Sequence, residues 1–286
     1  MLNNQKAESS YLSVINTWPE YFESMDEGLG TTYERFILHR YFTDIKQKYQ
    51  INSVLETPSF GMTGVSGINS LWWSQQGIKP VVVDTDEKRI KLYEQVWSSI
   101  PLDVKFQYTQ DLTKFSFENE SFDLSWNFAS LWFVDDLEKF AQELQRVTRK
   151  VIFICVPNVY GIGYKLREHY NEIPKGLHPT HIRPKLIRRL FESDHWKTWK
   201  SGYLDIPPWP DIAMKKEDLF PKIGLGFLIK NKTSADESQR TCIVDYFNGS
   251  WPDLEKDILK YSFLEKSPFP VKQIWAHHRY FIFVKS

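Results

Sequence analysis

Two short apolar runs, each ending in an acidic residue, constrain the fold of this chain most strongly. The first run is Val54-Leu55-Glu56, which precedes a loop with spaced glycines at Gly61, Gly64 and Gly67, and the second is Val81-Val82-Val83-Asp84. Apolar runs of this length are typical of buried strands, and glycines between them allow a sharp turn that approaches a ligand closely. The pattern predicts a strand, a binding loop, a helix with free N–H groups and a second strand, which is the start of a nucleoside-binding α/β domain.

The composition of the loop separates two classes of nucleoside ligand. A dinucleotide site needs Gly-x-Gly-x-x-Gly directly after the first strand, because the pyrophosphate binds the amides of that turn. Here the stretch reads Glu56-Thr57-Pro58-Ser59-Phe60-Gly61, with an acid first and a proline at the place of the first glycine. A carboxylate repels a pyrophosphate and attracts a cationic or amino-bearing ligand. The loop therefore favours a ligand such as S-adenosylmethionine over NAD.

Further blocks follow in the order that one protein family shares. An acid followed by an apolar residue occurs at Asp111-Leu112, a Phe-Asp strand start at Phe122–Asn127, and a second apolar strand behind a helix at Val151–Asn158. With Glu56 and Asp84 before them, these blocks span roughly residues 50 to 160. In this order the chain resembles the class I S-adenosylmethionine-dependent methyltransferases.

The resemblance implies a cofactor site and roles for its residues. Glu56 would hold the methionine amino group through the loop, Asp84 the ribose, and Asp111 with Leu112 the adenine, and S-adenosylhomocysteine would be the product. The full set of expected cofactor-binding residues is Tyr33, Glu56, Pro58, Gly61, Gly64, Asp84, Thr85, Asp111, Leu112 and Asn127. Which of the loop glycines touches the cofactor stays open, because the loop is longer than usual for the family.

The alternation of strands and helices predicts an α/β fold with a mostly parallel, doubly wound sheet, and the resemblance implies seven strands of which the last is antiparallel. A capping box at Thr31–Glu34 and apolar residues at intervals of four predict a helix from about 32 to 49, and Asp135 is the expected cap of a later helix. The last two strands are expected at 199–206 and 278–285, and the stretch between them is too long for a hairpin loop. The expected domains are a helical N-terminal extension that closes the cleft (1–50), a cofactor-binding core (51–206), an inserted cap (207–276) and the last core strand (277–286).

Histidines are the candidate catalytic bases if the methyl acceptor must lose a proton. His178 and His181 stand between the fifth strand and a basic helix, where members of the family often place residues that face the substrate. Solvent-facing or helix-capping histidines would have the same pattern. Pro179 interrupts any helix that would align the pair, so no metal site is expected there. His277 and His278 are expected to face opposite sides of the last strand.

Composition and charge favour a cytoplasmic enzyme that acts on a small molecule. The chain has 36 acidic and 36 basic residues and a net charge of zero, so no overall field attracts nucleic acid or an anionic membrane. Its two cysteines provide neither a disulfide framework nor a metal cluster, and no segment reads as a signal peptide or membrane span. Two alternatives stay open, a nicotinamide-dependent oxidoreductase and a noncatalytic methyltransferase-like binding protein. The oligomeric state is not predicted.

Overall fold

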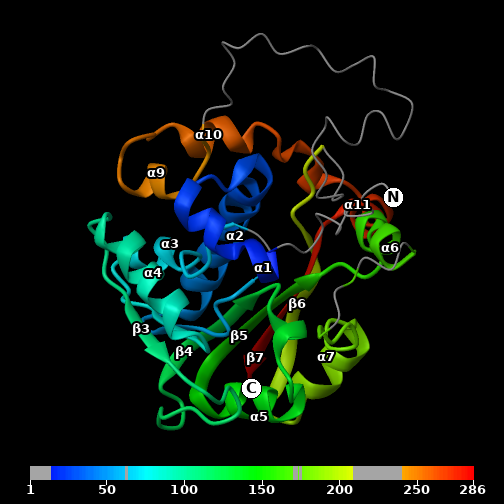
Figure 1. Ribbon diagram of the computed structural model, residues 1–286. Helices are drawn as coiled ribbons and strands as arrows, with labels where there is room; N and C mark the ends of the chain where they lie inside the picture. Colours follow the sequence, from blue (N-terminus) through cyan, green and yellow to red (C-terminus); the bar gives the residue numbers. More distant parts are fainter. Residues whose placement is uncertain (1–13, 62–63, 170–172, 174–175, 209–239) are drawn as a thin grey trace, which may run out of the picture.

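The computed structural model describes residues 14–61, 64–169, 173, 176–208 and 240–286. Its centre is a seven-stranded sheet in the order β3-β2-β1-β4-β5-β7-β6 (Figure 1). Strands β1 to β5 pair in parallel, and β7 is antiparallel to both of its neighbours. The predicted fold class is therefore confirmed. The strands are β1 (Val54–Glu56), β2 (Val81–Asp84), β3 (Lys105–Tyr108), β4 (Phe122–Phe128), β5 (Thr148–Pro157), β6 (Trp196–Leu204) and β7 (His278–Lys285).

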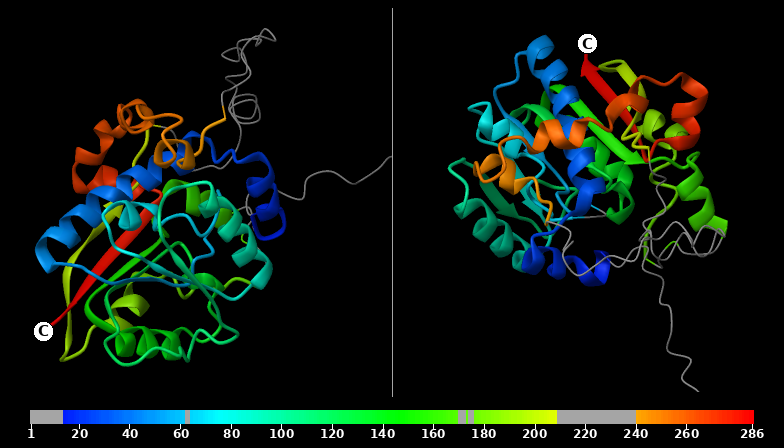
Figure 2. Two further views of the ribbon diagram at one scale, coloured as in Figure 1. Left: turned by 90° about the vertical axis from the view of Figure 1, so that its left-hand side faces the viewer. Right: turned by 90° about the horizontal axis from the view of Figure 1, so that it is seen from above.

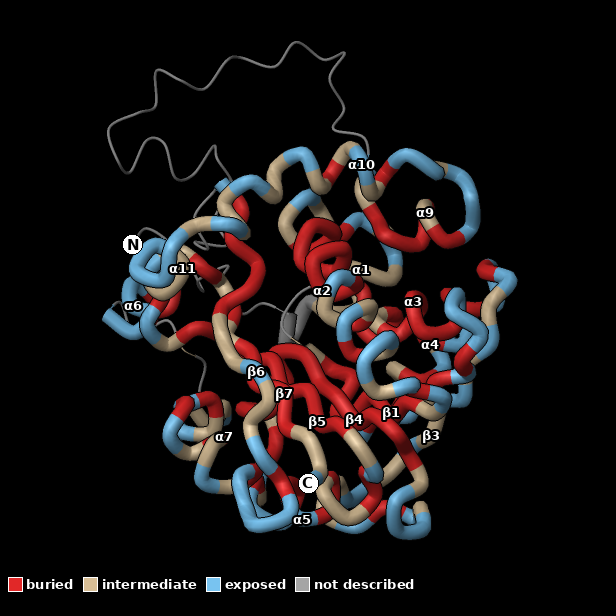
Figure 3. Tube along the Cα trace, turned by 180° about the vertical axis from the view of Figure 1, so that it is seen from behind, coloured by how far each residue is buried: buried red, intermediate tan, exposed pale blue. Residues whose placement is uncertain are grey.

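Helices cover both faces of the sheet, so the central strands are buried on both sides, as Figure 3 shows. Seven consecutive residues of β5, Val151–Pro157, are buried, which is the continuous apolar pattern of a strand between two helical layers. Helices α5 and α7 form one layer, and α2 and α3 lie in the other. The helices are α1 (Val14–Ser24), α2 (Gly28–Tyr49), α3 (Leu71–Gln75), α4 (Glu87–Ser98), η1 (Leu131–Phe133), α5 (Leu137–Val147), α6 (Ile162–His169), α7 (Pro184–Phe191), α9 (Val244–Phe247), α10 (Leu254–Leu259), η3 (Ser262–Lys266) and α11 (Phe269–Trp275).

Two predicted helix starts differ from the structure. Helix α2 begins at Gly28, so the expected cap Thr31 lies inside its first turn, and the hydroxyl of the next residue, Thr32, donates to the Gly28 carbonyl (3.0 Å). Helix α5 is capped by Asp136, whose carboxylate accepts from the Lys139 amide (3.0 Å), and the cap is therefore not Asp135. At α5 two adjacent aspartates offered a cap, whereas α2 begins without a side-chain cap and so leaves no capping signal in the sequence.

The β6–β7 hairpin stays closed at its end although a long segment is inserted there. Leu204 pairs with His278, and the His277 amide donates to the Asp205 carbonyl (2.9 Å). Strand β6 starts and ends earlier than the predicted 199–206, and β7 has its predicted bounds. Residues 240–276 of the insertion form α9, α10, η3 and α11, and α10 packs on α2. The remainder of the predicted cap from 209 to 239 lies outside the described residues.

The N-terminal extension contributes α1, which lies beside α4 in both views of Figure 2. Phe22 of α1 stacks on Tyr93 of α4, with 5.9 Å between ring centroids. Residues 1–13 of the expected cleft cover lie outside the described part of the chain. Among the described helices, none combines the length and the apolar character needed to cross a membrane.

Candidate functional site

Glu56 ends β1 and is fully buried below the glycine loop. Its carboxylate accepts hydrogen bonds from the Asn69 side-chain amide (3.0 Å) and the Ser70 hydroxyl (2.6 Å). Burial raises the pKa of Glu56 to about 7, against the opposing effect of these hydrogen bonds and of Arg35. Glu56 therefore lies near the balance between its neutral and charged forms at neutral pH. A positively charged group placed nearby would favour the carboxylate.

The glycine loop packs closely on the protein's own side chains. Gly64 has φ +76°, and a Cβ there would lie 2.6 Å from the Thr31 methyl group. Gly67 has φ +74°, and a Cβ would lie 2.4 Å from the Tyr93 ring. Both positions need glycine for backbone conformation and for space. The helix expected directly after the loop begins only at Leu71 and is short, because the loop follows the surface of α2 first.

A buried ion pair fixes the course of this loop. The Glu27 carboxylate accepts from the Val65 amide (3.0 Å), and the Arg35 guanidinium donates to the Val65 carbonyl (2.7 Å) and to the Asn69 side chain. Glu27 also accepts from the amide of Ile243, just before α9 (3.2 Å). The loop, α2 and the inserted segment thus share one hydrogen-bonded network.

Asp84 ends β2, and the protein's own donors occupy both of its oxygens. One oxygen accepts from the Asp86 amide (2.9 Å) and the Arg89 guanidinium (2.6 Å), and the other from the hydroxyls of Ser59 (2.8 Å) and Tyr93 (2.6 Å). A ribose would therefore compete with existing donors at this carboxylate, and Arg89 is the half of the ion pair that could be displaced, since its side chain is partly exposed.

The remaining predicted residues at this edge are more exposed. Thr85 is exposed beside Asp84. Asp111 is exposed as well, and hydrogen bonds from the Thr113 hydroxyl (2.6 Å) and amide (2.7 Å) lower its pKa. Leu112 is half-buried, and Pro58 is buried between β1 and the loop. The structure thus places Thr85, Asp111 and Leu112 along the ends of β2 and β3, outside the buried part of the site.

Buried polar atoms without partners gather where the strand order reverses, between β1 and β4. They are the Thr57 hydroxyl, both side-chain amide atoms of Asn127 and the Ser130 hydroxyl, and among the described residues they have no hydrogen-bond partner. The Thr57 amide donates to the Trp126 carbonyl (3.0 Å), so the ends of these strands are adjacent. Buried polar groups in proteins are nearly always paired, and ligands of open α/β sheets bind at this reversal. These atoms therefore mark a place where a ligand would complete the hydrogen bonding.

A second group of charged side chains lies at the same end of the sheet. The Nδ1 atoms of His277 and His278 lie 3.0 and 3.1 Å from the same oxygen of Asp205. Burial favours the neutral acid, but the two imidazoles outweigh it and hold the pKa of Asp205 at about 2. The expectation that His277 and His278 face opposite sides is wrong, because His277 precedes β7 and does not follow the alternation of the strand.

Tyr33 belongs to this second group. Its hydroxyl donates to the Glu265 carboxylate (3.1 Å), which also accepts from the Ile206 amide (2.6 Å). Burial raises the pKa of Glu265 to about 7, and Asp205 adds to the effect. Tyr33 thus connects α2 to the inserted segment.

The predicted bases His178 and His181 stack on each other, with 4.7 Å between ring centroids. The His181 Nδ1 atom lies 3.0 Å from the Val134 carbonyl, and the His178 Nε2 atom lies 3.4 Å from an Asp135 carboxylate oxygen. Both rings are half-buried. Burial lowers the pKa of His181, and His178 lowers it further. The pair lies against the segment that follows β4 and η1.

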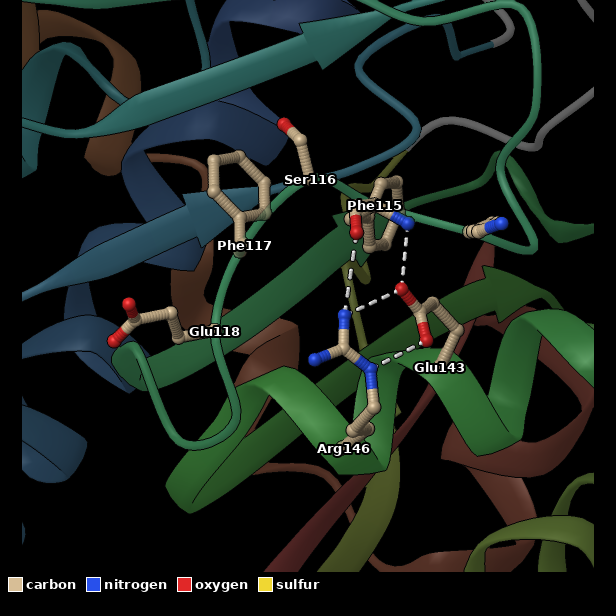
Figure 4. Close-up of a pocket in the computed structure, with 7 residues that line it drawn as sticks. Phe115, Ser116, Phe117, Glu118, Glu143 and Arg146 are labelled. Carbon is tan, nitrogen blue, oxygen red and sulfur yellow. Dashed lines mark hydrogen bonds and ion pairs between the residues drawn. The ribbon is translucent and has the colours of Figure 1, made fainter.

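Two surface hollows lie away from these residues. One, of about 470 Å³, is lined by Phe115–Glu118 and by Glu143 and Arg146 of α5 (Figure 4). Arg146 donates to Glu143 (2.7 Å) and to the Phe115 carbonyl (3.3 Å), so its charge is already paired. The other, of about 420 Å³, lies between Thr43, Trp72 and Gln76. Neither includes the ends of β1, β2 or β4, so we assign no ligand to them.

Comparison with known proteins agrees with the sheet topology. Residues 61–154 match the model of a methyltransferase domain family. The chain has the class I methyltransferase fold. The solved structure of magnesium protoporphyrin IX methyltransferase from Synechocystis PCC 6803, determined with bound S-adenosylhomocysteine, is 9% identical, covers 96% of each chain and has a TM-score of 0.57. A putative methyltransferase in complex with the Haloferax volcanii Trm112 activator is 10% identical over 96% of each chain, with a TM-score of 0.52. At these identities the two structures show a shared fold, and no curated protein sequence matches the chain.

Class I methyltransferases use S-adenosylmethionine, and the residues of this domain fit that cofactor in most places. The unpaired atoms of Thr57, Asn127 and Ser130 offer both donors and an acceptor to a polar ligand. Glu56 is buried at the end of β1, and an amino group bound next to it would stabilise the charged form of its carboxylate. Asp84 fits a ribose only after Arg89 has moved away.

Several residues of the site escaped sequence analysis. The sequence position of Thr57 could have indicated a site residue, because Thr57 directly follows the acid that ends β1. Arg89 had a weaker signal, since it lies on the first turn of the helix after Asp84. Asp205 had none, because only the closed end of the β6–β7 hairpin brings it to His278.

Proposed function

We propose that this chain transfers the methyl group of S-adenosylmethionine to a small-molecule acceptor by in-line displacement. The observation that carries the proposal is the buried amide of Asn127, both of whose polar atoms are unpaired among the described residues. Thr57 and Ser130 add unpaired hydroxyls at the same strand ends. The family model and the shared fold supply the reaction class.

The chain's own residues bind and orient the reactants in this proposal. When bound, the cofactor supplies a methyl group that its sulfonium already activates, so catalysis depends mainly on alignment and on exclusion of water. Asn127 and Thr57 would hydrogen-bond the polar end of the methionine portion. The Glu56 carboxylate, below the loop, would attract the amino group of the methionine portion. Gly61, Gly64 and Pro58 would shape the loop around that amino group. Asp84 with Thr85 would accept the ribose hydroxyls once Arg89 has moved, and Asp111 with Leu112 would flank the adenine.

Acceptor binding is proposed on the side of the insertion. Helix α10 of the inserted segment packs on α2 and shares its buried cluster on one face of the sheet, which favours an enclosed acceptor over a large polymer. The net charge of zero also provides no field for nucleic acid. For an acceptor with a hydroxyl group, we propose His178 or His181 as the base. The lowered pKa of His181 favours the neutral ring that a base requires.

Transfer of a labelled methyl group tests this function directly. The purified chain is incubated with methyl-labelled S-adenosylmethionine and a metabolite extract, and the products are separated into small molecules, protein and RNA. The proposal predicts label in the small-molecule fraction, and Asn127→Leu should reduce it. Label only in protein or RNA would refute the small-molecule acceptor, and no label in any fraction, from protein that binds the cofactor, would support a noncatalytic role.

A further inference from the structure

Glu34, Asp205 and His278 form a buried cluster with the composition and spacing of a metal site. Their exposed fractions are 7%, 1% and 7%. His278 Nδ1 lies 3.1 Å from Asp205 Oδ2 and 3.8 Å from Glu34 Oε2, and all three atoms lie within 4.8 Å of one another. Ligands at 2.0 to 2.1 Å from a tetrahedral Zn²⁺ are about 3.3 Å apart, and the two separations from His278 Nδ1, 3.1 and 3.8 Å, lie close to that value.

The fold holds these side chains together from distant parts of the sequence. Glu34 comes from the second turn of α2, Asp205 follows the last residue of β6, and His278 is the first residue of β7. The hydrogen bond from the His277 amide to the Asp205 carbonyl closes the hairpin end and fixes the spacing of the last two. A bound ion would therefore meet ligands that the folded backbone has already placed.

Charge and hydrogen bonding leave a place for a cation. Two carboxylates lie close together in the interior, and a bound metal would take over the charge compensation that the imidazoles of His277 and His278 provide without it. Asp205 Oδ1 is buried and lacks a partner among the described residues, although the side chain is only 1% exposed. His277 Nδ1 lies 3.0 Å from Oδ2, and this kind of contact commonly orients a ligating carboxylate.

We propose that Glu34, Asp205 and His278 bind one divalent cation, for which Zn²⁺ is the best match. A set of one imidazole and two carboxylates suits Zn²⁺ better than Mg²⁺ or Ca²⁺, which prefer oxygen ligands alone. Three protein ligands leave a coordination position open, as in catalytic zinc sites. The His278 ring lies 4.5 Å from the ring of Phe128, the last residue of β4. Cation binding by these three residues does not depend on the proposed function.

Metal binding is measured on the untagged chain without reference to activity. After chelator treatment, titration with ZnCl₂ should give one Zn²⁺ per chain in calorimetry, and CoCl₂ should give the visible absorption of a low-coordinate Co²⁺ site. Asp205→Asn and Glu34→Gln should each weaken Zn²⁺ binding by at least about tenfold. The matched control is Asp194→Asn with His195→Gln, an exposed pair of the same residue types, which should leave Zn²⁺ binding unchanged.

The wild-type titrations decide the proposal even if a variant does not fold. Absence of both Zn²⁺ heat and Co²⁺ absorption in the wild-type chain would overturn it and leave a cluster held by hydrogen bonds and ion pairs alone. Equal loss of binding in the control and in Asp205→Asn would overturn it as well. Zn²⁺ binding without methyl transfer would support the site and count against the proposed function, while metal-independent transfer would support the function alone.

Discussion

Replacing Glu56 with Gln should stabilise the cofactor-free protein above pH 7 and also weaken cofactor binding. Glu56 is fully buried, and its pKa is raised from 4.5 to about 7. At about 1.4 kcal/mol for each pH unit, this rise corresponds to roughly 3 kcal/mol of unfolding free energy. Gln has the same shape and keeps both contacts, because its oxygen accepts from Asn69 and its amide donates to the Ser70 oxygen. The variant therefore removes the buried charge and little else.

The sign of the effect follows from the direction of the pKa change. Between pH 4.5 and about 7, the folded protein retains the Glu56 proton that the unfolded chain has lost. Wild-type stability therefore falls as the pH rises through this window, and it stays lower above it. A glutamine side chain at this position does not titrate. The advantage of Glu56→Gln should thus be near zero below pH 4.5 and reach its full value above pH 7.

Denaturant unfolding at pH 4.5 and pH 8 measures this difference, with the exposed Glu118→Gln as the control. The variant should gain roughly 3 kcal/mol at pH 8, which is on the order of 5 to 10 °C in melting temperature. Calorimetry at pH 8 should show S-adenosylhomocysteine binding weakened about tenfold to hundredfold, since a charged contact is lost. A variant that is less stable than the wild type at pH 8, or an effect that does not change with pH, would refute the reasoning.

Three further changes test separate parts of the site. Asn127→Leu should leave the stability of the cofactor-free protein unchanged or higher, because the amide has no partners to lose among the described residues. In calorimetry it should weaken S-adenosylhomocysteine binding at least about tenfold. A stable variant with wild-type affinity would exclude Asn127 from the site. Asp84→Ala should raise the dissociation constant roughly tenfold to hundredfold, whereas Arg89→Met should lower it, and the same direction for both would contradict the ribose assignment. His178→Ala and His181→Ala should retain S-adenosylhomocysteine affinity, and the variant that lacks the true base should lose about a hundredfold or more of the methylation rate; two variants with unchanged rates would place the base elsewhere.

The sequence predicted best those parts of the fold that depend on local pattern. Val54–Glu56 and Val81–Asp84 form the predicted strands because apolar runs bounded by loops have few other ways to be buried. The antiparallel β7 was also predicted with its bounds. The start of α2 at Gly28 was missed by a few residues, because no side chain caps it, and the Asp136 cap of α5 was missed by one residue, because Asp135 is adjacent.

The candidate site was less predictable, because its chemistry depends on contacts between distant segments. Asp84 was placed correctly at the end of a strand. That Arg89, Ser59 and Tyr93 already donate hydrogen bonds to its carboxylate depends on the path of the loop. The meeting of Asp205 with His278 requires a hairpin that remains closed across a long insertion. No local spacing in the sequence contains that information.

The central claim is that the switch point between β1 and β4 binds S-adenosylmethionine. Isothermal titration calorimetry of the wild-type chain with S-adenosylmethionine, S-adenosylhomocysteine, NADH and NADPH tests this claim most directly. We expect one molecule of S-adenosylmethionine or S-adenosylhomocysteine to bind per chain, and no heat from either nicotinamide cofactor. Binding of NADH or NADPH without binding of S-adenosylhomocysteine would contradict the account in favour of an oxidoreductase, and absence of binding by all four would contradict it in favour of a protein without a cofactor site.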